Sequence, residues 1–310
     1  MSDHFFPPAI IGCAAALVGA VAAGGGVVLV RGSTAVPAAW WAVVACLAAA
    51  LECAGLAAGG VADHASRSSV RLVVVALSLC PIMAILGAKR PQHGVWQFIV
   101  GSLAVVLALP ALSAAVVRPG TAPDVHLLER GFVLVLLLVG WLNFVATRHG
   151  LAATLVCAGQ GVWCREFLPL FSGAGGMSDA TAWPDMTAAL LVAAGAALAI
   201  TQSTLATWRR HARMQESWER GHAAASLADR VGPPFLALRE TLGAAWTLRI
   251  IERFNAVAAE RTWPWRLRFT GLETTGGQVD ATAERAACRT LQGLLRRFVT
   301  GAWLTRHGWH

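Results

Sequence analysis

Long apolar runs separated by short polar segments fill the first two-thirds of the chain. A helix needs roughly 20 mainly apolar residues to cross the hydrocarbon core of a bilayer, which is about 30 Å thick. The pattern predicts an all-α polytopic membrane protein with seven transmembrane helices, in a domain that covers residues 1–206. The expected helices cover residues 9–30, 36–59, 70–87, 95–117, 131–146, 151–171 and 185–206.

The composition favours the same class of protein. Of the 310 residues, 56% are hydrophobic and 14% are charged, whereas ordinary soluble chains are about 25% charged. The lipid bilayer is therefore the expected partner of the apolar runs. Lys89 is the only lysine, and arginine supplies the remaining positive charge. This bias is typical of a GC-rich genome and indicates a bacterial source.

The distribution of arginine indicates an orientation, because short cytoplasmic loops are enriched in Lys and Arg. Arg209, Arg210 and Arg213 follow the last apolar run, whereas segment 172–184 before that run contains neither Lys nor Arg. We therefore expect the N-terminus outside and the C-terminus in the cytoplasm, in a bacterial cell (inner) membrane. Four arginines remain on the outer side and count against this orientation: Arg67, Arg71, Arg118 and Arg130.

After residue 206 the chain becomes basic. Residues 207–310 contain sixteen arginines against nine acidic residues, a net charge of +7. An apolar stripe at helical spacing predicts a helix over residues 235–260, with Pro233 and Pro234 suited to its first turn. A second amphipathic helix is expected over residues 281–300.

A strand is expected between these two helices, because Trp265, Leu267 and Phe269 alternate with polar residues. The region therefore predicts a small cytoplasmic α/β domain of helix–strand–helix order. A single strand needs a partner for its backbone groups. That partner is either segment 278–279 after a glycine turn or the same strand of a second copy, which would give a homodimer through the C-terminal domain.

The amphipathic helix over residues 281–300 has two interpretations. Its apolar face either packs on helix 235–260, which is favoured because Trp246 and Phe254 need cover, or lies on the anionic inner leaflet. Its arginines could then bind the membrane surface or a cytoplasmic protein partner. Nucleic acid is not an expected partner, because no recognised nucleic-acid-binding fold is indicated. The arginines concerned are Arg285, Arg289, Arg296 and Arg297.

Ionisable residues inside apolar runs are costly and are therefore candidates for function. Glu52 lies in the second run, and Arg165 and Glu166 reach a similar outer depth on the sixth. An Arg165–Glu52 pair would keep both charges buried and could line a path for a small solute or ion. In the other interpretation Glu52 is protonated and Arg165 reaches the interface. Gln160 and Asn143 are neutral candidates that interhelical hydrogen bonds explain.

Acidic residues and histidines are neighbours in the segments expected outside. Converging loops of this kind could bind a divalent metal through imidazole nitrogen and carboxylate oxygen. The spacing matches no known ligand signature, and polar loop residues are expected in any case. The candidates are His4, Asp63, His64, Asp124 and His126.

Motifs of common enzyme classes are absent from the sequence. There is no phosphate-binding GxxxxGK[ST], no HExxH and no GxSxG. The seventh run has no lysine for a retinal Schiff base, and no cysteine pair has CxxC spacing. We therefore expect no cofactor. The leading hypothesis is a non-enzymatic anchor or sensor that couples the helix bundle to a partner-binding domain. A transporter and an outer-face metal-dependent membrane enzyme are the alternatives.

Overall fold

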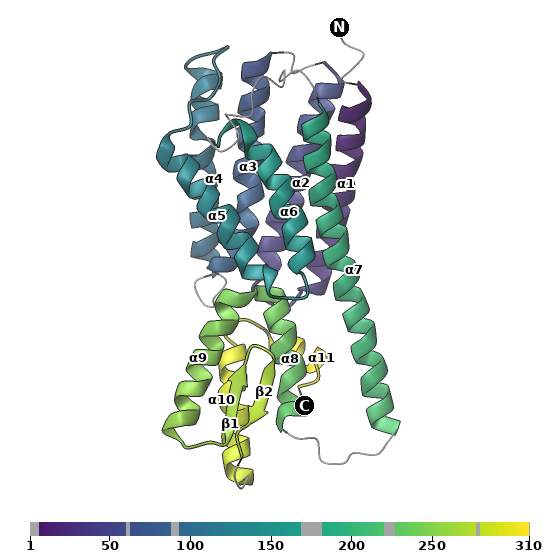
Figure 1. Ribbon diagram of the computed structural model, residues 1–310, viewed down its shortest axis with the longest axis vertical. Coiled ribbons are helices and arrows are strands. Elements are labelled where there is room, and N and C mark those ends of the chain that lie inside the picture. The colour runs from purple at the N-terminus through teal and green to yellow at the C-terminus, as the bar shows by residue number, and fades with distance from the viewer. Residues whose placement is uncertain are drawn as a thin grey trace.

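The computed structural model describes residues 6–59, 63–87, 93–168, 182–219, 227–276 and 280–309. Roughly antiparallel helices form a long bundle, and a smaller domain lies at one end of it (Figure 1). The bundle consists of α1 (Phe6–Leu29), α2 (Val36–Ala57), α3 (His64–Leu86), α4 (His93–Val116), α5 (Leu127–Val145), α6 (Gly150–Trp163), the 3₁₀ turn η1 (Cys164–Glu166) and α7 (Trp183–Glu219).

Six of these helices, α1 to α5 and α7, are long and apolar enough to cross a membrane. Large apolar side chains stand exposed on their outer surfaces, among them Val21, Leu51 and Phe98, each at least 74% exposed. Lipid rather than water suits such a surface. A membrane location is thus supported for six of the expected spans. The 14 residues of α6 rise only about 21 Å, so α6 is shorter than a complete crossing.

Small residues bring α6 and α7 together. A methyl group added at Gly159 would lie 2.8 Å from the carbonyl oxygen of Ala188. One added at Gly195 would lie 2.8 Å from the carbonyl oxygen of Ala152. The two backbones are therefore closer than any larger residue allows, as is common between helices in lipid.

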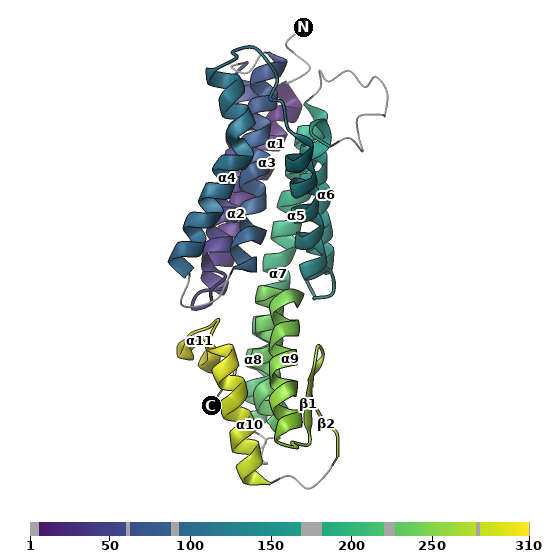
Figure 2. The ribbon, with the colours of Figure 1, turned by 90° about the vertical axis from the view of Figure 1, so that its left-hand side faces the viewer.

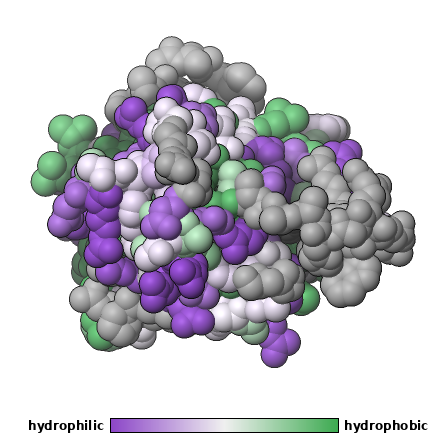
Figure 3. Space-filling model, turned by 90° about the horizontal axis from the view of Figure 1, so that it is seen from below, coloured by the Kyte–Doolittle hydropathy of each residue, from purple (hydrophilic) through white to green (hydrophobic). Residues whose placement is uncertain are grey.

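The C-terminal domain lies beneath the bundle and has its own hydrophobic core (Figure 2). Seen from this end, its described residues are largely hydrophilic (Figure 3), as expected for a part of the chain in water. The domain consists of α8 (Leu227–Leu242), α9 (Ala244–Glu260), β1 (Trp265–Arg268), β2 (Gly271–Thr274), α10 (Ala281–Leu295) and α11 (Gly301–Arg306).

The helix expected over residues 235–260 is two helices. Gly243 divides α8 from α9, because its backbone adopts φ +78°, a conformation that glycine favours. Pro233 and Pro234 lie inside α8, not in its first turn. The turn before them, which includes Asp229 and Arg230, is exposed, so water can reach backbone carbonyls that the prolines leave without an N–H donor.

The predicted strand is confirmed as β1, and its partner is β2 in an antiparallel hairpin. The expected partner, segment 278–279, lies outside the described residues. On the other side of β1, Asn255 donates from Nδ2 to the carbonyl of Leu267 at 2.9 Å and accepts from the Leu267 N–H at 2.8 Å. The strand therefore needs no second copy, and the homodimer stays a prediction.

The packed interpretation of the last amphipathic helix is confirmed. Ala287, Leu291 and Leu295 of α10 are buried in the core of the C-terminal domain, with Phe298 just beyond them. Its apolar face is therefore not available to lipid. The four candidate arginines, Arg285, Arg289, Arg296 and Arg297, are exposed, so binding of a membrane surface or partner by them remains a prediction.

Candidate functional site

A cluster of buried charges ties four elements together at the end of the bundle far from the C-terminal domain. Arg71 of α3 is fully buried, and its guanidinium donates to Glu52 of α2 at 2.7 Å and to Glu166 of η1 at 3.0 Å. It also pairs with Asp185 in the first turn of α7. Glu52 and Asp185 are 3% and 2% exposed. One guanidinium thus holds carboxylates from three other elements.

Arg165 forms the rim of this charge cluster. Its guanidinium donates to Asp185 at 3.2 Å and to the carbonyl oxygen of Val162 at 3.0 Å, and lies 3.4 Å from Glu166. The Ser68 hydroxyl donates to the second oxygen of Glu166 at 3.2 Å. Buried charges are tolerated only when paired and hydrogen-bonded, and the planar guanidinium suits several carboxylates at once. The cluster therefore fixes α2, α3, η1 and α7 in one arrangement.

The cluster brings together some of the predicted residues and changes their pairing. Glu52 and Glu166 meet, but Arg71, not Arg165, is the partner of Glu52. The expected orientation places Arg71 on the outer side of the membrane, although Arg71 is the second residue of the expected span 70–87. Asp185 was only the first residue of an expected span. A charge at the edge of an apolar run was the signal that could have identified both.

The two neutral candidates lie elsewhere. Gln160 of α6 donates from Nε2 to the carbonyl of Ser78 in α3 at 2.7 Å, an interhelical hydrogen bond of the kind expected. Asn143 lies near the other end of the bundle, where α5 meets the C-terminal domain.

Two of the five acid–histidine candidates serve as helix caps. Asp63 accepts from the Ser66 N–H at 2.8 Å, which lowers the pKa of its carboxyl, and His126 caps α5. His64 and Asp124 are exposed, and His4 lies outside the described residues. Within the described part of the chain, no group of three or more His, Cys, Asp or Glu residues could hold a metal. The metal site stays a prediction without support.

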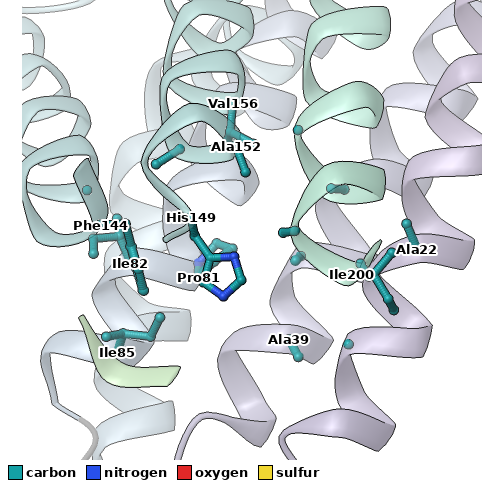
Figure 4. Close-up of a pocket in the computed structure, with 18 of the residues that line it drawn as sticks. Ala22, Ala39, Pro81, Ile82, Ile85, Phe144, His149, Ala152, Val156 and Ile200 are labelled. Atoms are coloured by element: carbon teal, nitrogen blue, oxygen red, sulfur yellow. The ribbon is translucent and has the colours of Figure 1, made fainter. Parts of the chain in front are cut away.

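A cavity of about 420 Å³ lies within the bundle and extends to the C-terminal domain. Six helices of the bundle, all except α4, contribute to its wall, and α8 contributes from below. The wall is largely apolar and rich in small side chains, which leave the space open (Figure 4). Residues drawn there include Ala22, Ala39, Pro81, Ile82, Ala152 and Ile200.

Polar groups gather where the cavity meets the C-terminal domain. The imidazole of His149 projects into the cavity (Figure 4), with Nδ1 3.0 Å from Oε1 of Gln202. The Arg148 N–H donates to the buried carboxylate of Glu240 at 2.9 Å, and Glu240 also pairs with Arg239. Burial lowers the pKa of His149, and the nearby Arg148 guanidinium lowers it further.

Acidification should therefore weaken the fold through His149. The pKa of His149 in the folded chain is below the ordinary value of about 6.5. As pH falls, the imidazole is therefore protonated in the unfolded chain before it is protonated in the folded chain. The stabilising effect is complete above about pH 6.5 and is lost as pH falls toward the lower, folded-state pKa. In thermal unfolding between about pH 7.5 and pH 5.5, we expect a larger drop in Tm for the wild type than for His149→Gln. Equal drops would contradict this.

The bundle and the C-terminal domain are joined by hydrogen bonds at the Gly243 break. Asn143 donates from Nδ2 to the Leu242 carbonyl at 3.0 Å and accepts from the Ala245 N–H at 2.9 Å. It thereby binds the end of α8 and the start of α9 together. Trp246 donates from its indole nitrogen to the Ile85 carbonyl at the end of α3, at 2.8 Å.

A second junction joins the α1–α2 turn to the segment after α10. The Thr34 N–H donates to the Phe298 carbonyl, and the Thr300 N–H donates to the Gly32 carbonyl, each at 2.8 Å. The Arg306 guanidinium donates to the Arg31 carbonyl at 2.6 Å. The C-terminal ends of α3 and α5 and the α1–α2 turn are therefore bonded to the C-terminal domain, at positions far apart in the sequence.

Comparison with known proteins assigns no family. No protein-family model matches the chain, and neither a curated protein nor a solved structure does.

Proposed function

We propose that this chain is a multi-pass integral membrane protein in which the helix bundle and the C-terminal domain act as one coupled unit. In this function the bundle anchors the protein or senses a change, and the C-terminal domain passes the change to a cytoplasmic partner. The observation that carries the proposal is the pair of hydrogen bonds from Asn143 to Leu242 and Ala245. A shift of α5 would act directly on the joint between α8 and α9.

The membrane arrangement belongs to the same proposal. We infer seven crossings in a bacterial cell membrane, with α6 and η1 together forming the short sixth crossing. The N-terminus would then be outside and the C-terminal domain in the cytoplasm. Arg209 supports a cytoplasmic position of the domain, because this exposed arginine is the last residue of the apolar part of α7.

Replacing Asn143 with alanine should loosen the joint while leaving the bundle intact. The change leaves the Leu242 carbonyl and the Ala245 N–H without their partner, at a cost of about 1–3 kcal/mol for each group that stays buried. We expect faster hydrogen–deuterium exchange over residues 242–250 of the full chain in nanodiscs. The exchange of α5 itself should change little.

Asn255 provides a matched control inside the C-terminal domain. Its side chain makes the same pair of bonds to Leu267, but contacts no bundle residue through them. Asn255→Ala should speed exchange in β1 and leave residues 242–250 as in the wild type. Should Asn143→Ala leave the exchange of those residues unchanged, the coupling proposal would be wrong.

Transport of a small solute or ion remains the second candidate. The observation that favours it is the cavity, which lies within the bundle between the charge cluster and the C-terminal domain. Arg71 would replace Arg165 as the partner of Glu52 in such a path. Flux of solute into proteoliposomes is expected of a transporter and not of an anchor or sensor.

A further inference from the structure

The cavity has the shape of an elongated ligand. Its wall includes residues of α6 from Ala152 to Trp163, a rise of about 16 Å along that helix. On α7 the lining residues run from Val192 to Thr207, a rise of about 22 Å. The volume of about 420 Å³ falls within the range of small-molecule sites. A long apolar molecule fits this extent along the helices better than a compact one.

The polar end of the cavity carries an excess of positive charge. Two guanidinium groups, those of Arg148 and Arg239, face the single carboxylate of Glu240. The Arg148 side chain is one-third exposed, and its Nε lies 3.8 Å from Glu240. Its two terminal nitrogens make no hydrogen bond to another residue of the described ranges. Among the described residues, an anionic group at this end would find an excess of positive charge and the terminal nitrogens of Arg148 as donors.

We propose that the cavity binds a long acyl chain with an anionic head, the chain lying between the six helices and the head at Arg148. The apolar wall suits the acyl chain, and the guanidinium donors of Arg148 suit a carboxylate or phosphate head. His149 lies beside Arg148 at the same end, where its Nε2 accepts from the Arg148 Nε at 3.4 Å and its Nδ1 lies 3.0 Å from Oε1 of Gln202. Such a ligand would touch the bundle and α8 together, so it deepens the coupling proposed above.

Photo-crosslinking of a defined probe tests this site. The full chain is reconstituted in phosphatidylcholine nanodiscs with diazirine-bearing palmitate. A parallel sample contains phosphatidylglycerol carrying the same acyl chain. After irradiation, labelled peptides are mapped by mass spectrometry. We expect stronger labelling of residues 148–163 and 192–207 than of α4, which does not line the cavity. Labelling only by palmitate identifies a free fatty acid, and labelling only by the phospholipid identifies a bilayer lipid.

Filling the cavity should exclude the probe. Ala196 and Ala199 line it from α7, whereas Ala194 on the same helix is exposed elsewhere. We expect Ala196→Leu with Ala199→Leu to lower labelling of the cavity segments about ten-fold, because added methyl groups occupy the space. Ala194→Leu should leave it unchanged. Equal labelling in all three proteins, or labels no stronger than those of α4, would overturn the proposal.

Arg148→Gln tests the head group independently of cavity filling. It should lower labelling by palmitate about ten-fold, while labelling by diazirine-bearing hexadecanol, which has the same chain without the charge, stays within about two-fold. Equal loss of both probes would contradict an anionic head. If the probe binds but does not alter hydrogen exchange over residues 242–250, the ligand site stands and the proposed coupling is wrong.

Discussion

Replacing Arg71 with methionine is expected to destabilise the bundle by about 3–5 kcal/mol, the usual effect of removing one partner from a buried ion pair. Methionine leaves the carboxylates of Glu52 and Asp185 buried with no guanidinium from α3. Arg165 reaches only Asp185 and Glu166. The expected result is a lower apparent Tm in detergent and lower yield of the folded protein.

Two further variants make the Arg71 experiment specific. Arg118 is exposed at the same end of the bundle, so Arg118→Met should leave the apparent Tm nearly unchanged. Adding Glu52→Gln to Arg71→Met removes one of the unpaired charges and should recover part of the loss. If Arg71→Met and Arg118→Met melt alike, the charge cluster does not stabilise the bundle.

Gly243→Ala is expected to have the second large effect, about 3 kcal/mol or more. Gly243 has φ +78°, and an added methyl group would lie 2.2 Å from Nδ2 of Asn143 and 2.6 Å from the Asn143 carbonyl oxygen. The backbone would have to move away from α5, which opens the joint between α8 and α9. Calorimetry of the purified chain and hydrogen exchange over α9 measure the effect.

Gly293 is the matched control for this substitution. It lies inside α10 and is exposed, and an added methyl group would meet nothing within 4 Å outside its chain neighbours. Gly293→Ala should therefore stabilise α10 by about 0.5–1 kcal/mol through helix propensity. Equal effects of the two glycine substitutions would show that the contact with Asn143 does not constrain Gly243.

The elements of the fold could be predicted where the signal is local. Apolar run length located six helices, although α3 begins six residues before the expected span and α7 continues thirteen residues beyond it, to Glu219. Alternation located β1. The break at Gly243 was missed because the apolar stripe continues across it from Leu242 to Trp246. The hairpin was missed because its turn, Phe269 and Thr270, contains none of the residues that mark tight turns.

The candidate site was less accessible from the sequence, because its members come from different helices. Glu52 was identified as a lone carboxylate in an apolar run, but depth along a helix does not tell which helices are neighbours. Arg165 has a similar depth to Arg71, and only packing selects Arg71. The cavity could not be predicted from the sequence. Alanine and glycine residues that line a cavity have the same sequence pattern as those that bring two helices into contact.

The membrane arrangement underlies the proposed coupling and the ligand site, and the sides reached by the two ends of the chain test it most directly. A short epitope tag is placed at each terminus, and access of antibody and protease to each tag is measured in intact and in permeabilised spheroplasts. Seven crossings predict that the N-terminal tag is reached in intact spheroplasts and the C-terminal tag only after permeabilisation. Tags reached on the same side would contradict seven crossings and the cytoplasmic position of the C-terminal domain.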